Sequence, residues 1–278
     1  MSVEYPEARI LATQMSESLT GMVVGPCELT GAEKMQRIGF INKDARDFDS
    51  LVGRRIEKVE CKGNTIRIGL SGGLSLLLAP EYGGVVLLKR KGEEFSVFHL
   101  KVSFTDGGTL TVRLTGMGII KVTSNDELSE VYVYKRDFMG APSPRSPELT
   151  REGFVEQLRA KGTQLKPLIV GKDALLVGLS NSAYQDVLFR AKVHPRRRAS
   201  ELSVEEAGAL YDGIVALVTE RLRLGGKAGF VDLHGKPGGY LPLMGPNMKG
   251  KRCQRCGALV EKATLGGGQV FFCPGCQK

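Results

Sequence analysis

The strongest constraint on this chain lies near its C-terminus, where two Cys-x-x-Cys pairs stand sixteen residues apart. The first pair is Cys253 with Cys256 and the second is Cys273 with Cys276. This spacing falls within the C-x2-C-x15–20-C-x2-C pattern of zinc sites. Four thiolates close a tetrahedral shell around one structural ion and leave no open position for catalysis. Two disulfides or four free thiols are the alternatives, and the spacing favours zinc.

The cysteine-rich segment is also basic. Its cations are Lys249, Lys251, Arg252, Arg255 and Lys262, against one acid, Glu261. The whole chain carries a formal net charge of +9, with a pI of about 9.3. Such a charge favours a polyanionic partner, so the zinc segment is interpreted as a nucleic-acid finger.

Length and composition exclude several classes of protein. At 278 residues and 42% hydrophobic content, the chain is expected to fold into two domains plus the finger rather than to be disordered. No apolar run approaches the roughly 18 residues that a membrane span needs, and the N-terminus lacks the apolar core of a signal peptide. The isolated Cys27 and Cys61 suit a reducing compartment. We therefore expect a cytoplasmic protein without a membrane partner.

The first half of the chain is predicted to be one helix followed by many strands. A helix is expected from Pro6, because apolar residues from Ala8 to Leu19 recur at helical spacing. Between residues 22 and 133, short apolar runs alternate with glycine-rich or Asp-Gly turns. The predicted strands include 66–68, 74–78, 85–88, 95–104, 110–114 and 119–122. Strands of this length and spacing indicate a sandwich or barrel.

The second half is predicted to be helical. Three prolines mark residues 138–148 as a domain boundary. Helices are expected over residues 150–160, 165–170, 181–190 and 203–223. The glycine-rich stretch 225–239 is predicted to be a mobile loop.

Several short motifs in this half resemble the Fpg/Nei (formamidopyrimidine-DNA glycosylase / endonuclease VIII) family. They are Gly-Leu-Ser-Asn at 178–181, Leu-Phe-Arg-Ala at 188–191, His-Pro at 194–195 and Gly-Lys-Pro-Gly at 235–238. Their order, followed by the four-cysteine finger, is similar to that of the family's helix–two-turns–helix domain. The resemblance runs from about residue 140 to 278, and the opening Glu4-Tyr5-Pro6-Glu7 also looks like the family's start.

The resemblance implies an α+β multidomain fold and a nucleic-acid partner. It implies an N-terminal β-sandwich domain with a leading helix over 1–137, a linker over 138–148, a helix–two-turns–helix domain over 149–245 and a zinc finger over 246–278. It further implies a monomer that binds damaged or abasic duplex DNA in the nucleoid-associated cytoplasm. Structured RNA stays open as an alternative partner.

The resemblance also implies a DNA glycosylase and AP lyase activity. In the family, an N-terminal proline amine attacks C1′ of the damaged nucleotide, and elimination from the resulting Schiff base nicks the strand. An α-amino group has a pKa near ~8, so a useful fraction is nucleophilic at neutral pH. Glu4 matches the family's catalytic glutamate, and Ser2 would carry the free amine after removal of Met1.

Five further residues are expected to contact DNA. Asn181 and Lys166 match family residues that hold phosphates, which fix register without reading sequence. Met117 would fill the hole left by an extruded base, and Arg190 and Lys236 would add basic contacts. Local alternatives exist, because Asn181 could cap its own helix and Lys166 could be a solvated surface cation.

The departures from the family pattern fall at positions that carry the family's catalytic and void-filling residues. Val3 stands in place of the proline, Asn64 in place of a sheet lysine, and Tyr82 in place of a void-filling methionine. The family's Arg-Arg-Phe wedge falls at residues 115–117, and its finger arginine falls at Gly268. These changes leave two functions open. One is a glycosylase with variant chemistry, and the other is a nucleic-acid-binding protein without catalysis.

Overall fold

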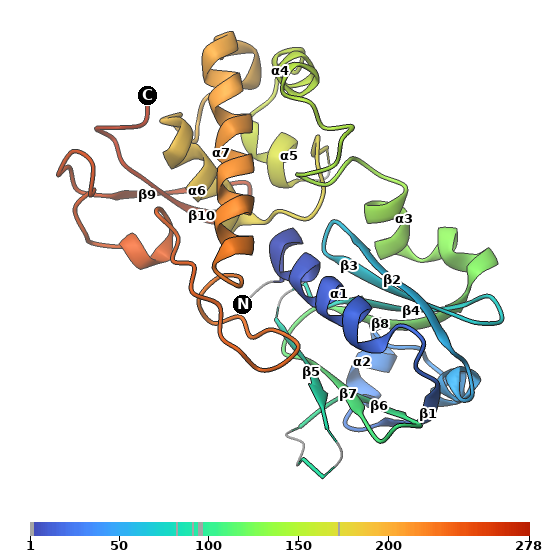
Figure 1. Cartoon of the computed structure of the whole chain (residues 1–278). Coiled ribbons are helices and arrows are strands. Elements are labelled where there is room, and N and C mark those ends of the chain that lie inside the picture. Colours follow the sequence, from blue (N-terminus) through green and yellow to red (C-terminus); the bar gives the residue numbers. More distant parts are fainter. Residues whose placement is uncertain (1–2, 82, 91, 94–96, 172) are drawn as a thin grey trace. The chain divides into compact units, whose positions relative to one another are not determined.

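The computed structural model describes residues 3–81, 83–90, 92–93, 97–171 and 173–278 (Figure 1). The chain divides into two compact units. One combines residues 1–140 with 224–239, and the other combines 141–223 with 240–278. The sequence division assigns residues 224–239 to the helical domain, but Phe230 and Leu233 are buried in the core of the first unit.

The first unit begins with α1 (Tyr5–Leu19), which starts one residue before the predicted position. Its first turn is closed by a capping box, in which the Glu7 side chain accepts the backbone N–H of Glu4 at 3.1 Å. The apolar face predicted from the sequence is buried, with Leu11, Met15 and Leu19 each at most 1% exposed. Burial of this face holds α1 on the unit that contains the sheets.

Two antiparallel four-stranded sheets form the body of the first unit (Figure 1). One has the order β1-β6-β7-β5 and the other β2-β3-β4-β8. Their strands are β1 (Val24–Leu29), β2 (Ile56–Lys62), β3 (Thr65–Leu70), β4 (Leu74–Ala79), β5 (Gly84–Lys89), β6 (Leu100–Phe104), β7 (Thr109–Leu114) and β8 (Ile119–Ser124). Side chains of both sheets share one apolar core, so the predicted β-sandwich is confirmed. The predicted strand 95–104 lies partly outside the described residues.

Short helical segments complete the first unit. They are α2 (Glu33–Arg37), α3 (Tyr132–Phe138) and the 3-10 turns Ala45–Leu51 and Asn125–Glu130. The β2–β3 hairpin turns at Gly63, whose φ is +56°. Next to it, the buried Asp137 carboxylate at the end of α3 accepts a 2.6 Å hydrogen bond from the Thr65 hydroxyl. This contact fixes α3 against the hairpin.

The second unit is helical and ends in a small hairpin. Its helices are α4 (Arg151–Arg159), α5 (Leu165–Val170), α6 (Asn181–Ala191) and α7 (Val204–Arg223), with 3-10 turns at Ala199–Glu201 and Pro246–Met248. All four predicted helices are present. The hairpin consists of β9 (Glu261–Leu265) and β10 (Gly268–Phe272). Among the described residues, no helix is long and apolar enough to cross a membrane.

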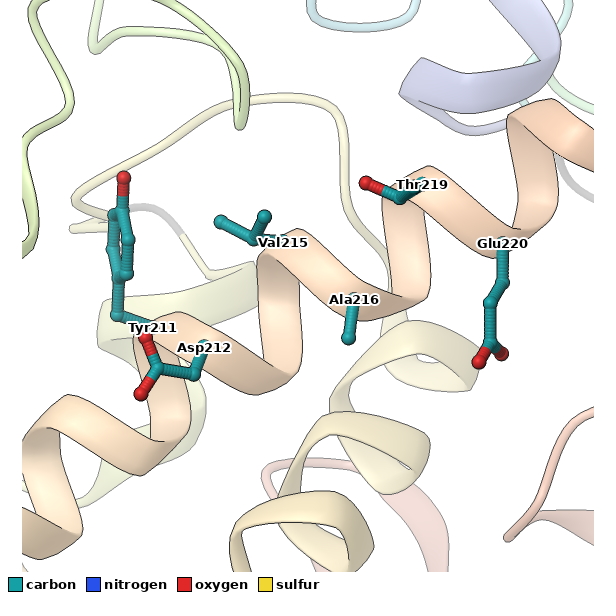
Figure 2. A pocket seen from close by; sticks show the side chains of 6 residues that line it. All are labelled: Tyr211, Asp212, Val215, Ala216, Thr219 and Glu220. Carbon is teal, nitrogen blue, oxygen red and sulfur yellow. The ribbon is translucent and has the colours of Figure 1, made fainter.

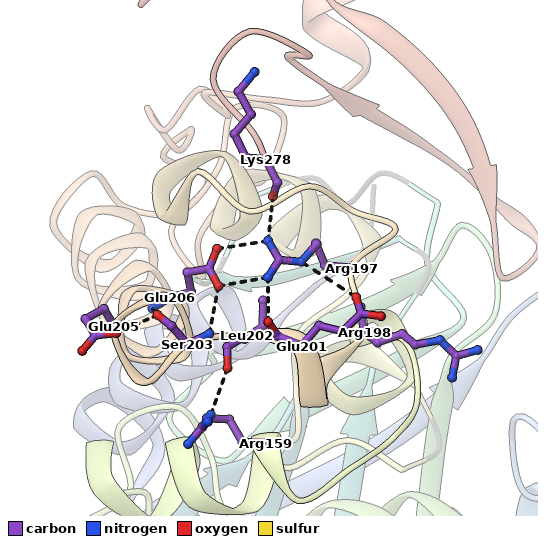
Figure 3. A network of polar contacts seen from close by, with 9 residues as sticks. All are labelled: Arg159, Arg197, Arg198, Glu201, Leu202, Ser203, Glu205, Glu206 and Lys278. Atoms are coloured by element: carbon purple, nitrogen blue, oxygen red, sulfur yellow. Dashed lines mark hydrogen bonds and ion pairs between the residues drawn. The ribbon is translucent and has the colours of Figure 1, made fainter.

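The start of α7 is tied to the last residue of the chain (Figure 3). Ser203 and Glu206 form a capping box with backbone-to-side-chain bonds of 2.9 and 3.2 Å. The Arg197 guanidinium donates to both Glu206 carboxylate oxygens at 3.0 Å and to the Lys278 carbonyl at 3.4 Å. The Ser203 N–H, followed by Arg197, holds the pKa of Glu206 below its usual value against the opposing effect of burial. Arg197 therefore has a structural role.

The close contact between Gly63 and the Asp137 carboxylate leads to a testable prediction about stability. A Cβ on Gly63 would lie 2.6 Å from Asp137 Cγ, and its φ is unfavourable for other residues. Gly73 has a similar φ of +73° but open space around it, so Gly73→Ala is a matched control. We expect Gly73→Ala to cost about 1 kcal/mol from backbone strain. Gly63→Ala should cost roughly 2–3 kcal/mol more, because a buried carboxylate must move.

Thermal unfolding followed by calorimetry measures both variants. The Gly63→Ala midpoint should fall by several degrees more than that of Gly73→Ala. Equal shifts would show that Asp137 is not rigidly held.

Candidate functional site

The first group of candidate side chains surrounds the N-cap of α1. Glu4 occupies that position and is 1% exposed. Its Oε2 lies 3.2 Å from the Nζ of Lys227, whose side chain is 5% exposed. Glu7 joins the two backbones, because its Oε2 accepts the Glu4 N–H and its Oε1 accepts the Lys227 N–H, each at 3.1 Å. The result is a buried amine–carboxylate pair on a fixed backbone.

Lys227 is held in place by glycines of the 224–239 segment. Gly226 has φ of +94°, and a Cβ there would lie 2.5 Å from the Phe230 ring. A Cβ on Gly238 would lie 2.6 Å from the carbonyl oxygens of Gly226 and Lys227. Sequence reasoning missed Lys227 because the glycines were interpreted as a mobile loop. The signal that could have found it was a lysine directly after the Gly225-Gly226 pair, because paired glycines permit close approach of the backbone.

Val3 and Asn64 occupy two of the positions where the sequence departs from the family. Val3 is 2% exposed and belongs to the apolar core. Its carbonyl accepts a 3.4 Å hydrogen bond from the Asn64 amide, whose oxygen accepts one of 2.6 Å from Arg136. Burial opposes the charge of Arg136, but Asp137 and Glu81 raise its pKa above its usual value. The residues Ser2 and Tyr82, singled out from the sequence, lie outside the described residues.

The second group lies in the other unit, where Lys166 and Asn181 meet the β9–β10 hairpin. The Lys166 ammonium donates to the Leu265 carbonyl at 2.6 Å, and the Asn181 amide donates to the Gln269 carbonyl at 2.8 Å. A Cβ on Gly268 would lie 3.0 Å from Lys166 Nζ and 3.9 Å from the Asn181 amide. Three positions far apart in the sequence therefore converge. Burial lowers the pKa of Lys166.

Asn181 does not cap its own helix. The N-cap of α6 is Ser180, whose hydroxyl accepts the Ser182 N–H at 3.4 Å. The Oδ1 atom of Asn181 is buried and has no hydrogen-bond partner among the described residues. Its side chain is thus directed at the finger hairpin rather than at its own helix.

The other three expected DNA contacts have different surroundings. Arg190 is 11% exposed and bonds to Asp186 at 2.8 Å and Glu220 at 2.7 Å, so its charge is neutralised within the unit. Lys236 is exposed at the tip of the 224–239 segment. Met117 is 48% exposed in the turn between β7 and β8. Their roles as DNA contacts stay predictions, with Arg190 the least available of the three.

The four finger cysteines form a compact cluster, with all four Sγ atoms within 4.8 Å of one another. Cys253 and Cys276 are 3.8 Å apart, and Cys256 and Cys273 are 3.3 Å apart. A tetrahedron of sulfurs about 2.3 Å from an ion has edges of about 3.8 Å, so the cluster fits a metal centre. None of the chain's cysteines forms a disulfide in the described structure.

A shallow hollow of about 420 Å³ lies elsewhere, along α7 (Figure 2). Its lining residues all come from that one helix, and they are Tyr211, Asp212, Val215, Ala216, Thr219 and Glu220. Asp212 already pairs with Arg151 at 3.2 Å and Glu220 with Arg190. Functional groups from different elements do not converge there, so we assign it no role.

Comparisons with known proteins agree with this architecture. Residues 141–231 match the model of the formamidopyrimidine-DNA glycosylase H2TH domain. A formamidopyrimidine-DNA glycosylase of Bacillus cereus is 28% identical over 99% of this chain and 98% of its own length. One from Streptococcus pneumoniae is 26% identical, again over 99% of this chain and 98% of its own length.

Solved structures share the fold across the whole chain. Lactococcus lactis Fpg in complex with DNA containing an abasic site has a TM-score of 0.83 at 22% identity, with 99% of both chains covered. MutM in complex with DNA containing carbocyclic 8-oxo-G has a TM-score of 0.81 at 24% identity, also covering 99% of both. A β-sandwich joined to an H2TH domain and a four-cysteine finger thus defines the class. Residues 141–231 match this family's H2TH domain, and the chain as a whole is similar in sequence to formamidopyrimidine-DNA glycosylases, in agreement with the resemblance that its motifs indicated.

The contacts of Lys166 make a second testable prediction. Its bond to the Leu265 carbonyl holds the β9–β10 hairpin, and one such bond is worth about 1 kcal/mol. We expect Lys166→Met to raise amide hydrogen exchange within residues 261–272 by about fivefold. Lys262→Met, on the exposed face of β9, is the matched control and should leave exchange unchanged. Unchanged exchange in both variants would contradict the supporting role of Lys166.

Proposed function

We propose that this protein binds damaged or abasic duplex DNA as a repair protein of the Fpg/Nei type. The observation that carries the proposal is the convergence of Lys166 and Asn181 on the β9–β10 hairpin. Relatives that share the fold are described in complexes with abasic or modified DNA. The net charge of +9 favours the same class of partner.

Lys166 and Asn181 supply the donors that a backbone phosphate needs. Both side chains bond to hairpin carbonyls in this structure. For the neutral Asn181 amide, a phosphate oxygen is a stronger acceptor than a carbonyl, because a charge-assisted hydrogen bond is roughly twice as strong as a neutral one. The Lys166 ammonium would gain the Coulomb attraction of the phosphate charge. The lowered pKa of Lys166 reflects burial, and an approaching phosphate would favour its charged form. The two donors would then fix the register of the duplex.

We further propose that the cysteine cluster holds one structural zinc ion. Zinc suits four thiolates at these separations. The ion would join the two knuckles at the base of the hairpin that Lys166 and Asn181 contact. Its four-thiolate shell leaves no site for substrate, so it supplies folding energy rather than catalysis.

Base excision and AP lyase activity form the catalytic part of the proposal. Glu4 supports it, because a carboxylate at the N-cap of α1 can act as a general acid or base. The second candidate function is binding of duplex DNA or structured RNA without catalysis. It is supported by the replacement of the family's reactive and void-filling side chains at Val3, Asn64 and Gly268. We expect a cytoplasmic monomer in either case.

DNA binding is tested by fluorescence anisotropy on a duplex that carries a tetrahydrofuran abasic analogue. We expect Lys166→Met to weaken binding roughly tenfold and to reduce the slope of log K against log salt by about 1, because one phosphate contact is lost. Asn181→Ala should weaken binding with little change in slope, because its amide is neutral. Lys43→Met, an exposed lysine of the first unit, is the charge-matched control.

The same assay separates the alternatives. Equal losses for Lys166→Met and Lys43→Met would refute the assigned phosphate site. In a competition experiment, unlabelled hairpin RNA and unlabelled undamaged duplex are added at equal concentration to the labelled duplex. Displacement by the RNA but not by the undamaged duplex would identify structured RNA as the partner.

Metal removal gives a separate prediction for the finger. Titration of the thiols with a mercurial should release one zinc ion per chain, measured with a colorimetric zinc indicator. Gly275→Ala should weaken zinc binding by at least about tenfold, because a Cβ there would lie 2.9 Å from Cys256 Sγ. Gly250→Ala, with open space around it, is the control. Release of no zinc from freshly purified protein would refute the metal site.

A further inference from the structure

We propose that Lys227 supplies the amine nucleophile of this protein, with Glu4 as its acid–base partner. The inference rests on the proposed function, because it names the reacting group for abasic DNA. It places the amine 223 residues away from Glu4 in the sequence rather than at the N-terminus.

The surroundings of Val3 favour a nucleophile other than the family's N-terminal proline. The residue at the family's proline position is Val3, whose nitrogen is a peptide amide and therefore not nucleophilic. Its side chain is buried in the apolar core, and its carbonyl is bonded to Asn64. Glu4 is nevertheless present, buried, and paired with a primary amine. The chain thus retains the carboxylate and brings a different amine to it.

The geometry of the pair is specific. Lys227 Nζ and Glu4 Oε2 are 3.2 Å apart, which is within reach of direct proton transfer. Glu7 fixes both main chains, and Gly226 and Gly238 are required for the backbone to approach this closely. A buried ion pair is a poor source of stability, because desolvation offsets the Coulomb attraction. A merely stabilising contact at this place would be better made by apolar side chains.

A lysine beside a carboxylate can form an imine with an abasic sugar and then cleave the strand by elimination. Glu4 takes a proton from the Lys227 ammonium, and the neutral amine attacks the C1′ aldehyde of an open abasic sugar. The C–N bond forms, the carbinolamine loses water, and an imine remains. A base removes a proton from C2′, the C3′–O bond breaks, and the 3′ phosphate leaves. Water then hydrolyses the imine and returns the amine, so no oxidant or reductant is consumed.

Access to the amine requires the 224–239 segment to move. Lys227 is closed off in this structure, with a side-chain exposure of 5%. The segment contains glycines with positive φ at 225, 226, 229 and 235, where the backbone has the most freedom to rearrange. Opening at these glycines would expose Nζ to an abasic sugar after Glu4 has taken its proton across the 3.2 Å contact.

Borohydride trapping with peptide mapping tests the inference on the full-length protein. The protein is incubated with an aldehyde-bearing abasic duplex and sodium cyanoborohydride, digested, and analysed by mass spectrometry. We expect the reduced adduct on the peptide that contains Lys227. Trapping should persist when the N-terminus carries a tag.

Three substitutions in the pair, with Lys43→Met as the control, distinguish a nucleophile from a structural ion pair. Lys227→Arg keeps the positive charge beside Glu4 but cannot form an imine, so the adduct on this peptide should be lost while the melting temperature is preserved. Lys227→Met should lose trapping equally, and Lys43→Met should trap like the parent protein. Glu4→Gln should slow trapping by at least about a hundredfold, with any residual adduct still on Lys227.

Several outcomes would overturn the inference. These are an adduct on the N-terminal peptide, undiminished trapping by Lys227→Arg, or absence of any adduct. Binding to the tetrahydrofuran duplex, which cannot form an imine, is measured in parallel for every variant. Loss of that binding in the parent protein defeats the proposed function, whereas retained binding without a Lys227 adduct defeats the inference alone.

Discussion

The Glu7 carboxylate joins parts of the first unit that are otherwise separate in the sequence. One of its oxygens accepts the N–H of Glu4 and closes the first turn of α1, and the other accepts the N–H of Lys227. Both acceptor bonds are buried, where an unmet N–H would cost about 1–3 kcal/mol. Glu7 thereby helps to place Glu4 against Lys227, and burial of Phe230 and Leu233 holds the rest of the 224–239 segment in the first unit.

A comparable arrangement organises the other unit. The side chains of Lys166 in α5 and Asn181 in α6 donate hydrogen bonds to main-chain carbonyls of the finger hairpin. The cysteine cluster lies at the base of that hairpin. Side chains thus support a two-stranded element that is too small to be stable alone. The same donors are the ones suited to phosphate, so the proposed recognition of the duplex would use the atoms that support the hairpin.

The sequence predicts much of the fold because its signals are local. Helical spacing predicted α1 and α7, alternating apolar runs predicted β3, β4, β7 and β8, and cysteine spacing predicted the cluster of four thiols. The Lys227–Glu4 pair could not be predicted, because no periodicity links residues 223 positions apart. Arg190 was expected at a DNA surface for its charge, but its partners Asp186 and Glu220 become visible only in three dimensions.

The long separation between Glu7 and Lys227 bears on how the protein is made. The N-terminal strands and α1 leave the ribosome first, yet Phe230 and Leu233 of their core are synthesised after most of the helical unit. Contacts of such sequence separation form late, because a long loop must close before they do. Until then, part of the apolar core of the first unit stays exposed to solvent. Such a partly folded chain is prone to aggregate and can be bound by chaperones. Glu4 can meet Lys227 only after residue 227 has been synthesised, so no nascent chain that stops before this residue can hold the pair.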